Sequence, residues 1–201
     1  MANRNAPFGL SPFGYLNGSP WNGQARMYCI PSSDAANAYA IGDPVVLAGS
    51  ADSKGIPTVT LASAGYGNAI TGVIVGAGGI VYGGPGANPN NLNTTVVPVT
   101  KAQNYYVLVA DDPNILFVAQ EDSVGNNLAA TDVGNNIDLV AGTNSGHLSG
   151  WMIDSSTANT GNTRQVQIMQ FLQTPDNAIG TYGRWVVRIN NHSYRAGTTG
   201  V

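Results

Sequence analysis

The stretch YYVLVADDPNILFVAQ, residues 105–120, decides the fold class. Two apolar runs rich in Val, Ile, Leu, Tyr and Phe flank a centre that contains Asp112, Pro113 and Asn114. Aromatic and β-branched residues favour strands, Pro113 presets φ for a turn, and Asn114 tolerates a tight corner. The stretch therefore predicts a β-hairpin. Because both arms are apolar on both faces, we expect this hairpin to lie centrally in a sheet.

Short apolar runs recur along the rest of the chain, separated by Gly, Pro, Asn and Asp, and helical periodicity is nearly absent. This pattern is typical of all-β proteins. In RQVQIMQFLQ (164–173), the apolar residues alternate with Gln165 and Gln167, which predicts one dry and one wet face. In RWVVRIN (184–190), Trp185 begins a similar alternation. Further strands are expected at 25–30, 44–48, 58–62, 70–75, 95–100, 137–140, 164–172 and 184–190, and 126–131 is also compatible with a short helix.

About ten short strands with long polar loops predict one all-β domain, a β-sandwich of jelly-roll type, and 201 residues suit a single domain. We divide the chain into an extended N-terminal arm over residues 1–24, the β-domain over 25–190 and a polar C-terminal tail over 191–201. The Gly- and Asn-rich residues 76–93 are expected to form an exposed loop.

Charged residues make up 9% of the chain, against about 25% in an average soluble domain. Such a surface suits close packing against neighbours. The net charge is −3 and no basic patch stands out, so we expect no nucleic-acid partner. No apolar run approaches the ~20 residues of a membrane span, so we expect no membrane partner. The opening residues lack the apolar core of a signal peptide, which predicts synthesis and folding in a cytoplasm.

No residue pattern points to catalysis. Cys29 is the single cysteine, which excludes a disulfide within the chain and Cys-x-x-Cys metal sites, and we expect it to be buried and inert. His147, Ser149 and Asp154 could form a triad, but GHLSG (146–150) is not the nucleophile elbow, and surface loop residues are the simpler interpretation. We therefore expect no enzyme, no metal and no cofactor.

Two other patterns resemble functional sites only in part. The carboxylate pairs Asp111–Asp112 and Glu121–Asp122 point to opposite faces of a strand, so neither pair makes a glycosidase site alone. The glycines at 76–79 lack the third glycine of a dinucleotide loop, because Val81 occupies its place.

The stretch PFGLSPFGYLNGSPW, residues 7–21, sets large apolar side chains among prolines and glycines that forbid a helix or a central strand. Each aromatic side chain can bury ~150–250 Å². We therefore expect the arm to insert its side chains into grooves of a neighbouring subunit. The alternative is an arm that folds back over its own domain and covers an open end. The expected contact residues are Phe8, Leu10, Phe13, Tyr15 and Trp21.

Four stretches carry a family resemblance: RNAPFGLSPFGYLNGSPWNGQARMY (4–28), IGDPVVL (41–47), LVADDPNILFVAQE (108–121) and NAIGTYGRWVVRIN (177–190). The chain resembles the head decoration, or cement, proteins of tailed bacteriophages. The resemblance implies a β-sandwich or jelly-roll body that binds the major capsid protein on the outside of the capsid, after assembly in the bacterial cytoplasm. A homo-oligomer is expected, and dimer and trimer stay open.

Two other functions stay open. A carbohydrate- or receptor-binding β-domain of a phage fibre would use exposed aromatic rings with convergent Asp, Asn or Gln, and Trp151 with the Asn-rich loops could supply them. A β-fold hydrolase is the third hypothesis, and it rests only on Asp and His residues without a recognisable spacing.

Overall fold

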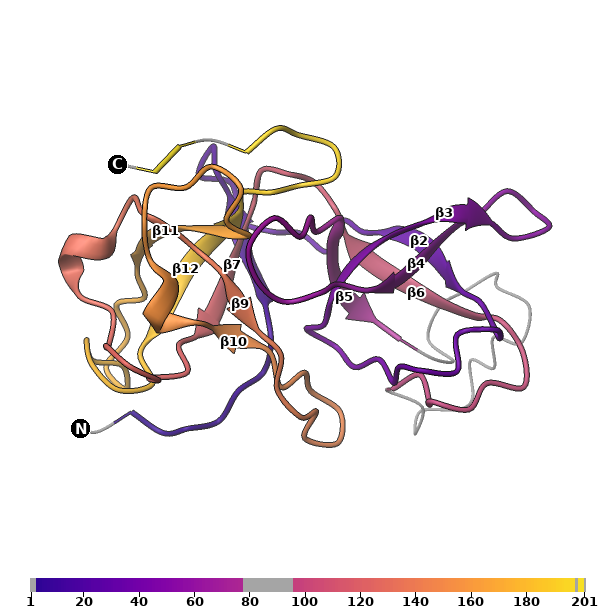
Figure 1. Cartoon of the computed structure of the whole chain (residues 1–201), viewed down its shortest axis with the longest axis horizontal. Helices are drawn as coiled ribbons and strands as arrows, with labels where there is room; N and C mark the ends of the chain where they lie inside the picture. The colour runs from indigo at the N-terminus through magenta and orange to yellow at the C-terminus, as the bar shows by residue number, and fades with distance from the viewer. Residues whose placement is uncertain (1–2, 78–95, 198, 201) are drawn as a thin grey trace.

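The computed structural model describes residues 3–77, 96–197 and 199–200. A closed barrel and an open sheet lie side by side along the long axis, with the barrel at the right in Figure 1. Among the described residues there is no α-helix, only the short 3₁₀ helices η2 (Ala130–Asp132) and η3 (Ser155–Thr157). The fold class is all-β, as the sequence predicts, and the short helix compatible with 126–131 is reduced to one 3₁₀ turn.

Five strands close the barrel in the order β2 (Arg26–Ile30), β4 (Pro57–Leu61), β3 (Pro44–Ala51), β5 (Gly72–Gly76) and β6 (Tyr105–Ala110). Strand β2 runs antiparallel to β6 and closes the barrel through a parallel pair, Cys29 with Thr58. The barrel is filled by its own core cluster of buried side chains, Tyr28, Ile30, Tyr39, Val45, Val59, Ile74, Ala77, Val97, Val107 and Val109.

The open sheet has the order β1 (Ser11–Tyr15), β7 (Ile115–Gln120), β12 (Arg184–Ile189), β11 (Val166–Phe171) and β8 (Asn136–Ile137). A separate ribbon pairs β9 (Leu139–Val140) with β10 (Met152–Ile153). All pairs of the sheet are antiparallel. Every second residue of β12 enters the core of this half of the molecule, which confirms the apolar face expected for 184–190: Trp185, Val187 and Ile189. The opposite face is not wet as expected, because Val186 is fully buried and Arg188 is only 6% exposed.

The central stretch 105–120 is not a hairpin, and this prediction was wrong. Strand β6 pairs with β2 and β5 in the barrel, whereas β7 pairs with β1 and β12 in the sheet. A turn does form, because the Ile115 N–H donates to the Asp112 carbonyl at 3.0 Å and the Asn114 N–H donates to Asp112 Oδ1 at 2.8 Å. The turn passes the chain from one β-body to the other. Both strands are interior strands of their sheets, as their two-sided apolar character requires.

The segment expected to be an arm belongs in part to the body. Residues 11–15 form β1 and pair with β7 from Ser11–Val118 to Tyr15–Ile115. The Leu10 N–H donates to the Gly42 carbonyl at 3.0 Å. A Cβ on Gly9 would lie 2.3 Å from that carbonyl oxygen, so only glycine permits this approach. The N-terminal segment therefore adds an edge strand to the sheet of its own chain, whereas the alternative interpretation had it cover an open end of the domain.

The C-terminal segment that the sequence marks as a polar tail is tied to the body at its start. The Ser193 N–H donates to the Ile70 carbonyl at 3.0 Å, and His192 is 4% exposed. The described β-structure consists of a closed barrel and an open sheet, with the β9–β10 ribbon apart from both. The loop expected at 76–93 lies almost entirely outside the described residues, and residues 96–100 form only a bridge between Val97 and Tyr39.

Candidate functional site: a groove beside the edge strand

Strand β1 forms an edge of the open sheet and carries a β-bulge. The register passes from Pro12–Phe117 directly to Gly14–Leu116, so Phe13 is the extra residue without a partner in β7. A bulge at a sheet edge re-aims a side chain, and Pro12 is tolerated there because an edge strand can spare an N–H. The consequence is an outward Phe13 side chain that is 47% exposed.

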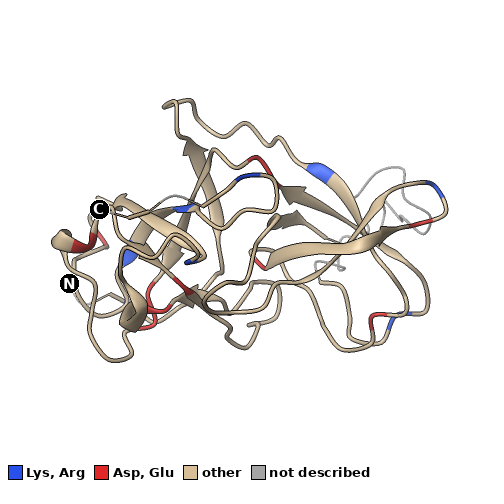
Figure 2. Ribbon diagram, turned by 45° about the horizontal axis from the view of Figure 1, so that its top comes forward, with Lys and Arg blue, Asp and Glu red and all other residues tan. Residues whose placement is uncertain are grey.

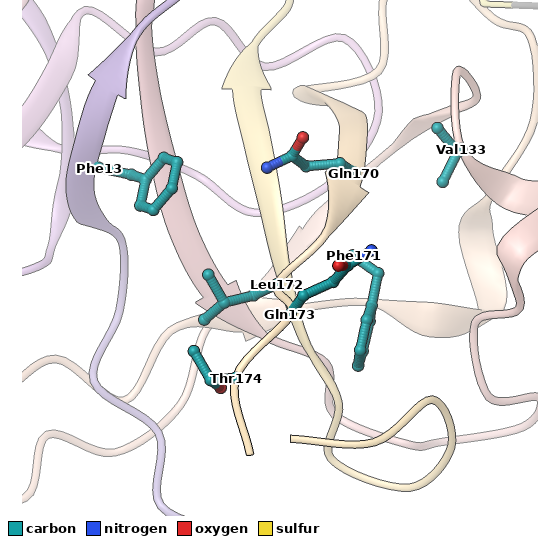
Figure 3. Close-up of a pocket in the computed structure, with 7 residues that line it drawn as sticks. All are labelled: Phe13, Val133, Gln170, Phe171, Leu172, Gln173 and Thr174. Atoms are coloured by element: carbon teal, nitrogen blue, oxygen red, sulfur yellow. The ribbon is translucent and has the colours of Figure 1, made fainter. Parts of the chain in front are cut away.

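A groove of about 450 Å³ lies beside this side chain. Figure 3 shows Phe13 on one side and the end of β11 on the other, with Leu172 directed toward Phe13. Strands β7 and β12 lie between the two walls. Strand β11 has a bulge of its own, because Ile168 pairs with Val187 and Gln170 pairs with Val186. The groove is lined by Phe13, Val133, Gln170, Phe171, Leu172, Gln173 and Thr174.

The groove beside β1 has no ionisable lining residue. It offers apolar surface from Phe13, Leu172 and Val133, and amide groups from Gln170 and Gln173. Its recognition chemistry is therefore shape, apolar burial and neutral hydrogen bonds, which salt screens little. Such a surface suits a protein partner better than an ion or a nucleotide.

The few charges of the chain are scattered over both β-bodies, as Figure 2 shows. Two of the arginines near the chain ends pair with carboxylates of the same chain. Arg26 Nε lies 2.6 Å from Asp111 Oδ2, and an Arg184 guanidinium nitrogen lies 2.7 Å from Asp176 Oδ1. These two guanidinium groups therefore form ion pairs within their own chain.

The five expected contact residues differ in how exposed their side chains are. Leu10 is 1% exposed and belongs to the core of its own chain, so it is not available to a partner, which corrects that assignment. Tyr15 and Trp21 are half-buried against the same core, and Phe8 is also half-buried. Phe13 alone of the five is largely exposed. Contact of these side chains with a partner stays a prediction, and Phe13 is the best placed to make it.

The structure does not bring His147, Ser149 and Asp154 together as a usable triad. Ser149 is fully buried, and its Oγ accepts a hydrogen bond from the Trp151 N–H at 3.1 Å. Asp154 caps η3 by accepting from the Ser156 N–H at 3.1 Å. His147 is exposed. A nucleophile at Ser149 would have no access to a substrate.

The members of each carboxylate pair accept hydrogen bonds from different parts of the chain. Asp111 Oδ2 accepts a hydrogen bond from the Tyr28 hydroxyl at 2.6 Å, while Asp112 caps the exposed turn. Glu121 accepts from the Leu128 N–H at 2.8 Å, and burial raises the pKa of its carboxyl above the usual range. Asp122 accepts from the Ser155 hydroxyl at 2.9 Å.

Cys29 is a buried free thiol, as expected, and burial and then Asp52 raise its pKa to about 11. Within the described ranges, no three His, Cys, Asp or Glu side chains gather as metal ligands. No helix in the described part of the chain is both long and apolar enough to cross a membrane.

Sequence reasoning found Phe13 but missed the opposite wall of the groove. Val133 follows η2 and Leu172 follows β11, and the fold brings both to the groove that Phe13 also lines, with Val133 beyond β11 (Figure 3). No local sequence pattern signals this wall, because strands β7 and β12 separate β1 from β11. Trp151, considered as a carbohydrate platform, is 2% exposed and is part of the core.

No family model matches the chain, and neither a curated protein nor a solved structure matches it.

Proposed function

We propose that the chain is a structural virion protein that binds the outside of a phage capsid and stabilises it. The observation that carries the proposal is Phe13, held outward by a bulge on an edge strand beside an uncharged groove. An exposed aromatic side chain next to an apolar groove is typical of the centre of a protein interface. The resemblance to decoration proteins supplies the partner, the major capsid protein.

The composition supports the same proposal. A surface with few charged residues packs closely against neighbours, and a capsid lattice presents hundreds of equivalent neighbours. Weak contacts per copy then suffice because many copies act together. Localisation on the capsid exterior, assembly in the bacterial cytoplasm and a homo-oligomer remain parts of this proposal, as does the finer assignment of the body to the jelly-roll class.

Substitution of the exposed side chain tests the proposal. Phe13→Ala removes apolar surface that binding would bury, and burying one such side chain is worth about 1.5–3 kcal/mol. We expect the variant to fold normally and to bind particles roughly tenfold to hundredfold more weakly. Binding is measured by mixing purified protein with capsids that lack it, sedimenting the particles and quantifying bound protein against the major capsid protein.

The matched control is Val124→Ala, because Val124 is 63% exposed and does not line the groove. It should decorate like the wild type. Equal binding of Phe13→Ala and the wild type would exclude the groove as the contact. No binding of the wild-type protein to such capsids would contradict the proposed function itself.

A further inference from the structure

A second surface cavity, of about 730 Å³, lies where the barrel meets the open sheet. We call it the junction cavity. It lies at the turn that passes the chain from β6 to β7 and is reached by both the N-terminal and the C-terminal segments. Among its lining residues are Tyr15, Gln24, Arg26, Asp111, Asp112 and Tyr194. Its volume lies within the range of small-molecule sites, about 300–1,000 Å³.

Hydrogen bonds hold the wall of the junction cavity in place. Asp111 Oδ2 accepts from the Tyr28 hydroxyl at 2.6 Å and pairs with Arg26 Nε at 2.6 Å. The Tyr194 hydroxyl lies 3.0 Å from the Tyr28 hydroxyl, and the Arg26 guanidinium lies 5.4 Å from the centre of the Tyr194 ring. The Tyr15 hydroxyl donates to Gln24 Oε1 at 3.0 Å. A wall that is ordered in advance loses little entropy when a ligand binds.

The same wall keeps aromatic and polar groups available. Tyr194 is 47% exposed although its hydroxyl is bonded. The Arg26 side chain is 65% exposed, so guanidinium N–H groups beyond Nε can still donate. Asp112 binds Asn114 through Oδ1, and Oδ2 accepts no hydrogen bond from a described residue. The junction cavity therefore combines the aromatic ring of Tyr194, the donor groups of Arg26 and the acceptor oxygen of Asp112.

This combination fits a sugar ring. The C–H face of a hexose packs on an aromatic ring, and each hydroxyl both donates and accepts, so adjacent hydroxyls match a carboxylate beside a guanidinium or an amide. The charged lining residues, one arginine and two aspartates, sum to −1 and disfavour an anionic ligand. A neutral sugar carries no charge that this lining would repel.

A neighbouring cavity of about 330 Å³ extends the surface. It shares Tyr15, Asp112 and Asn114 with the junction cavity and adds Leu16 and Asn17. Two adjoining cavities with a tyrosine between them suit consecutive sugar units. We propose that the junction cavity and this extension bind a neutral oligosaccharide. The inference uses no contact with the capsid and does not depend on the proposed function.

A glycan array tests this inference directly. Full-length protein carrying a fluorescent label is applied to neutral and anionic oligosaccharides, and the best neutral glycan is then titrated by calorimetry. We expect binding to at least one neutral oligosaccharide. Tyr194→Ala should weaken that binding about tenfold by removing the aromatic platform, and Tyr194→Phe, which keeps the ring, should retain most of it.

The control is Tyr66→Ala, because Tyr66 is 64% exposed and lines neither cavity. Circular dichroism checks that each variant is folded. Gln24→Ala, at an exposed lining residue, provides a second test if Tyr194→Ala does not fold. Any of three results would overturn the inference: no neutral glycan bound with an affinity of about 1 mM or better, binding of anionic glycans only, or neutral-glycan binding that the lining substitutions leave unchanged.

Discussion

His192 connects the C-terminal segment to the junction of barrel and sheet. It is 4% exposed, and its Nδ1 accepts a hydrogen bond from the Tyr194 N–H at 3.0 Å. Burial lowers the pKa of the imidazole, and this outweighs the opposing effect of Asp111 and Asp112. The folded protein therefore holds His192 in its neutral form, in which Nδ1 can accept.

This geometry predicts a pH dependence of stability. Unfolded His192 takes up a proton near pH 6.5, whereas folded His192 does so only at lower pH. The contribution of His192 to stability is therefore complete above about pH 6.5 and is lost as the pH falls toward the folded-state pKa. Between pH 7 and 5.5, we expect His192→Gln to reduce the loss of unfolding free energy by up to about 1.4 kcal/mol per pH unit.

The control for this measurement is His147→Gln, because His147 is the other histidine of the chain and is exposed. Urea unfolding at each pH gives the slopes, and the comparison between variants cancels the contribution of the buried carboxyls. An identical pH slope for His192→Gln and the wild type would contradict the buried, neutral state.

Gln165 shows what the sequence could not reveal at this scale. Alternation with Val166 placed it on a wet face, but it is fully buried. Its Oε1 accepts from the Gly65 and Leu139 N–H groups at 2.9 and 3.1 Å, and its Nε2 donates to the Ser63 carbonyl at 2.8 Å. Alternation predicts which face a side chain takes, but not whether another loop covers that face. For Val166 and Ile168, which lie in the core, the prediction is confirmed.

Strand β1 shows how an element with little local preference is held. Leu10 anchors its start in the core, and pairing with β7 fixes its register. The prolines and glycines that argued against a central strand are compatible with an edge strand that carries a bulge. An N-terminal segment that lacks a helix or an obvious strand pattern can thus be part of the body.

This arrangement predicts unequal effects of two neighbouring substitutions. Leu10→Ala leaves a cavity in the core and should lower the free energy of unfolding by about 2–5 kcal/mol. Phe13→Ala, at a side chain that is 47% exposed, should change it far less. Urea denaturation compares the two variants directly. A Leu10→Ala variant as stable as the wild type would mean that the segment is a dispensable arm.

For the two strands of residues 105–120, the sequence predicted where the strands lie but not which strands they pair with. Their existence, their positions and the turn at 112–115 followed from composition. Their partners did not, because a turn fixes the direction of the chain only locally. In this protein the Asp111 carboxylate binds Tyr28 and Arg26 of the barrel just as the chain leaves it for the sheet.

At the scale of the whole molecule, the barrel and the open sheet are joined by a shared hydrophobic core. The core of the open sheet includes Ile70, Val73 and Ala110 from the barrel segment of the chain, beside Phe117 and Trp185 of the sheet. The junction cavity depends on this assembly, because Arg26 of the barrel and Tyr15 of the sheet both line it. The groove beside β1 lies within the sheet half, but it also gathers residues from distant parts of the sequence. The sequence therefore indicated Phe13, but not the surfaces around it.

The copy number of the protein in purified phage particles tests the central proposal most directly. Quantitative mass spectrometry of particles freed of unbound protein gives its ratio to the major capsid protein. A decoration protein should be present in hundreds of copies per particle, in a fixed ratio to the capsid subunit, because it occupies equivalent sites of the lattice. A few copies per particle would indicate a fibre component instead, and absence from the particles would contradict a structural role in the virion.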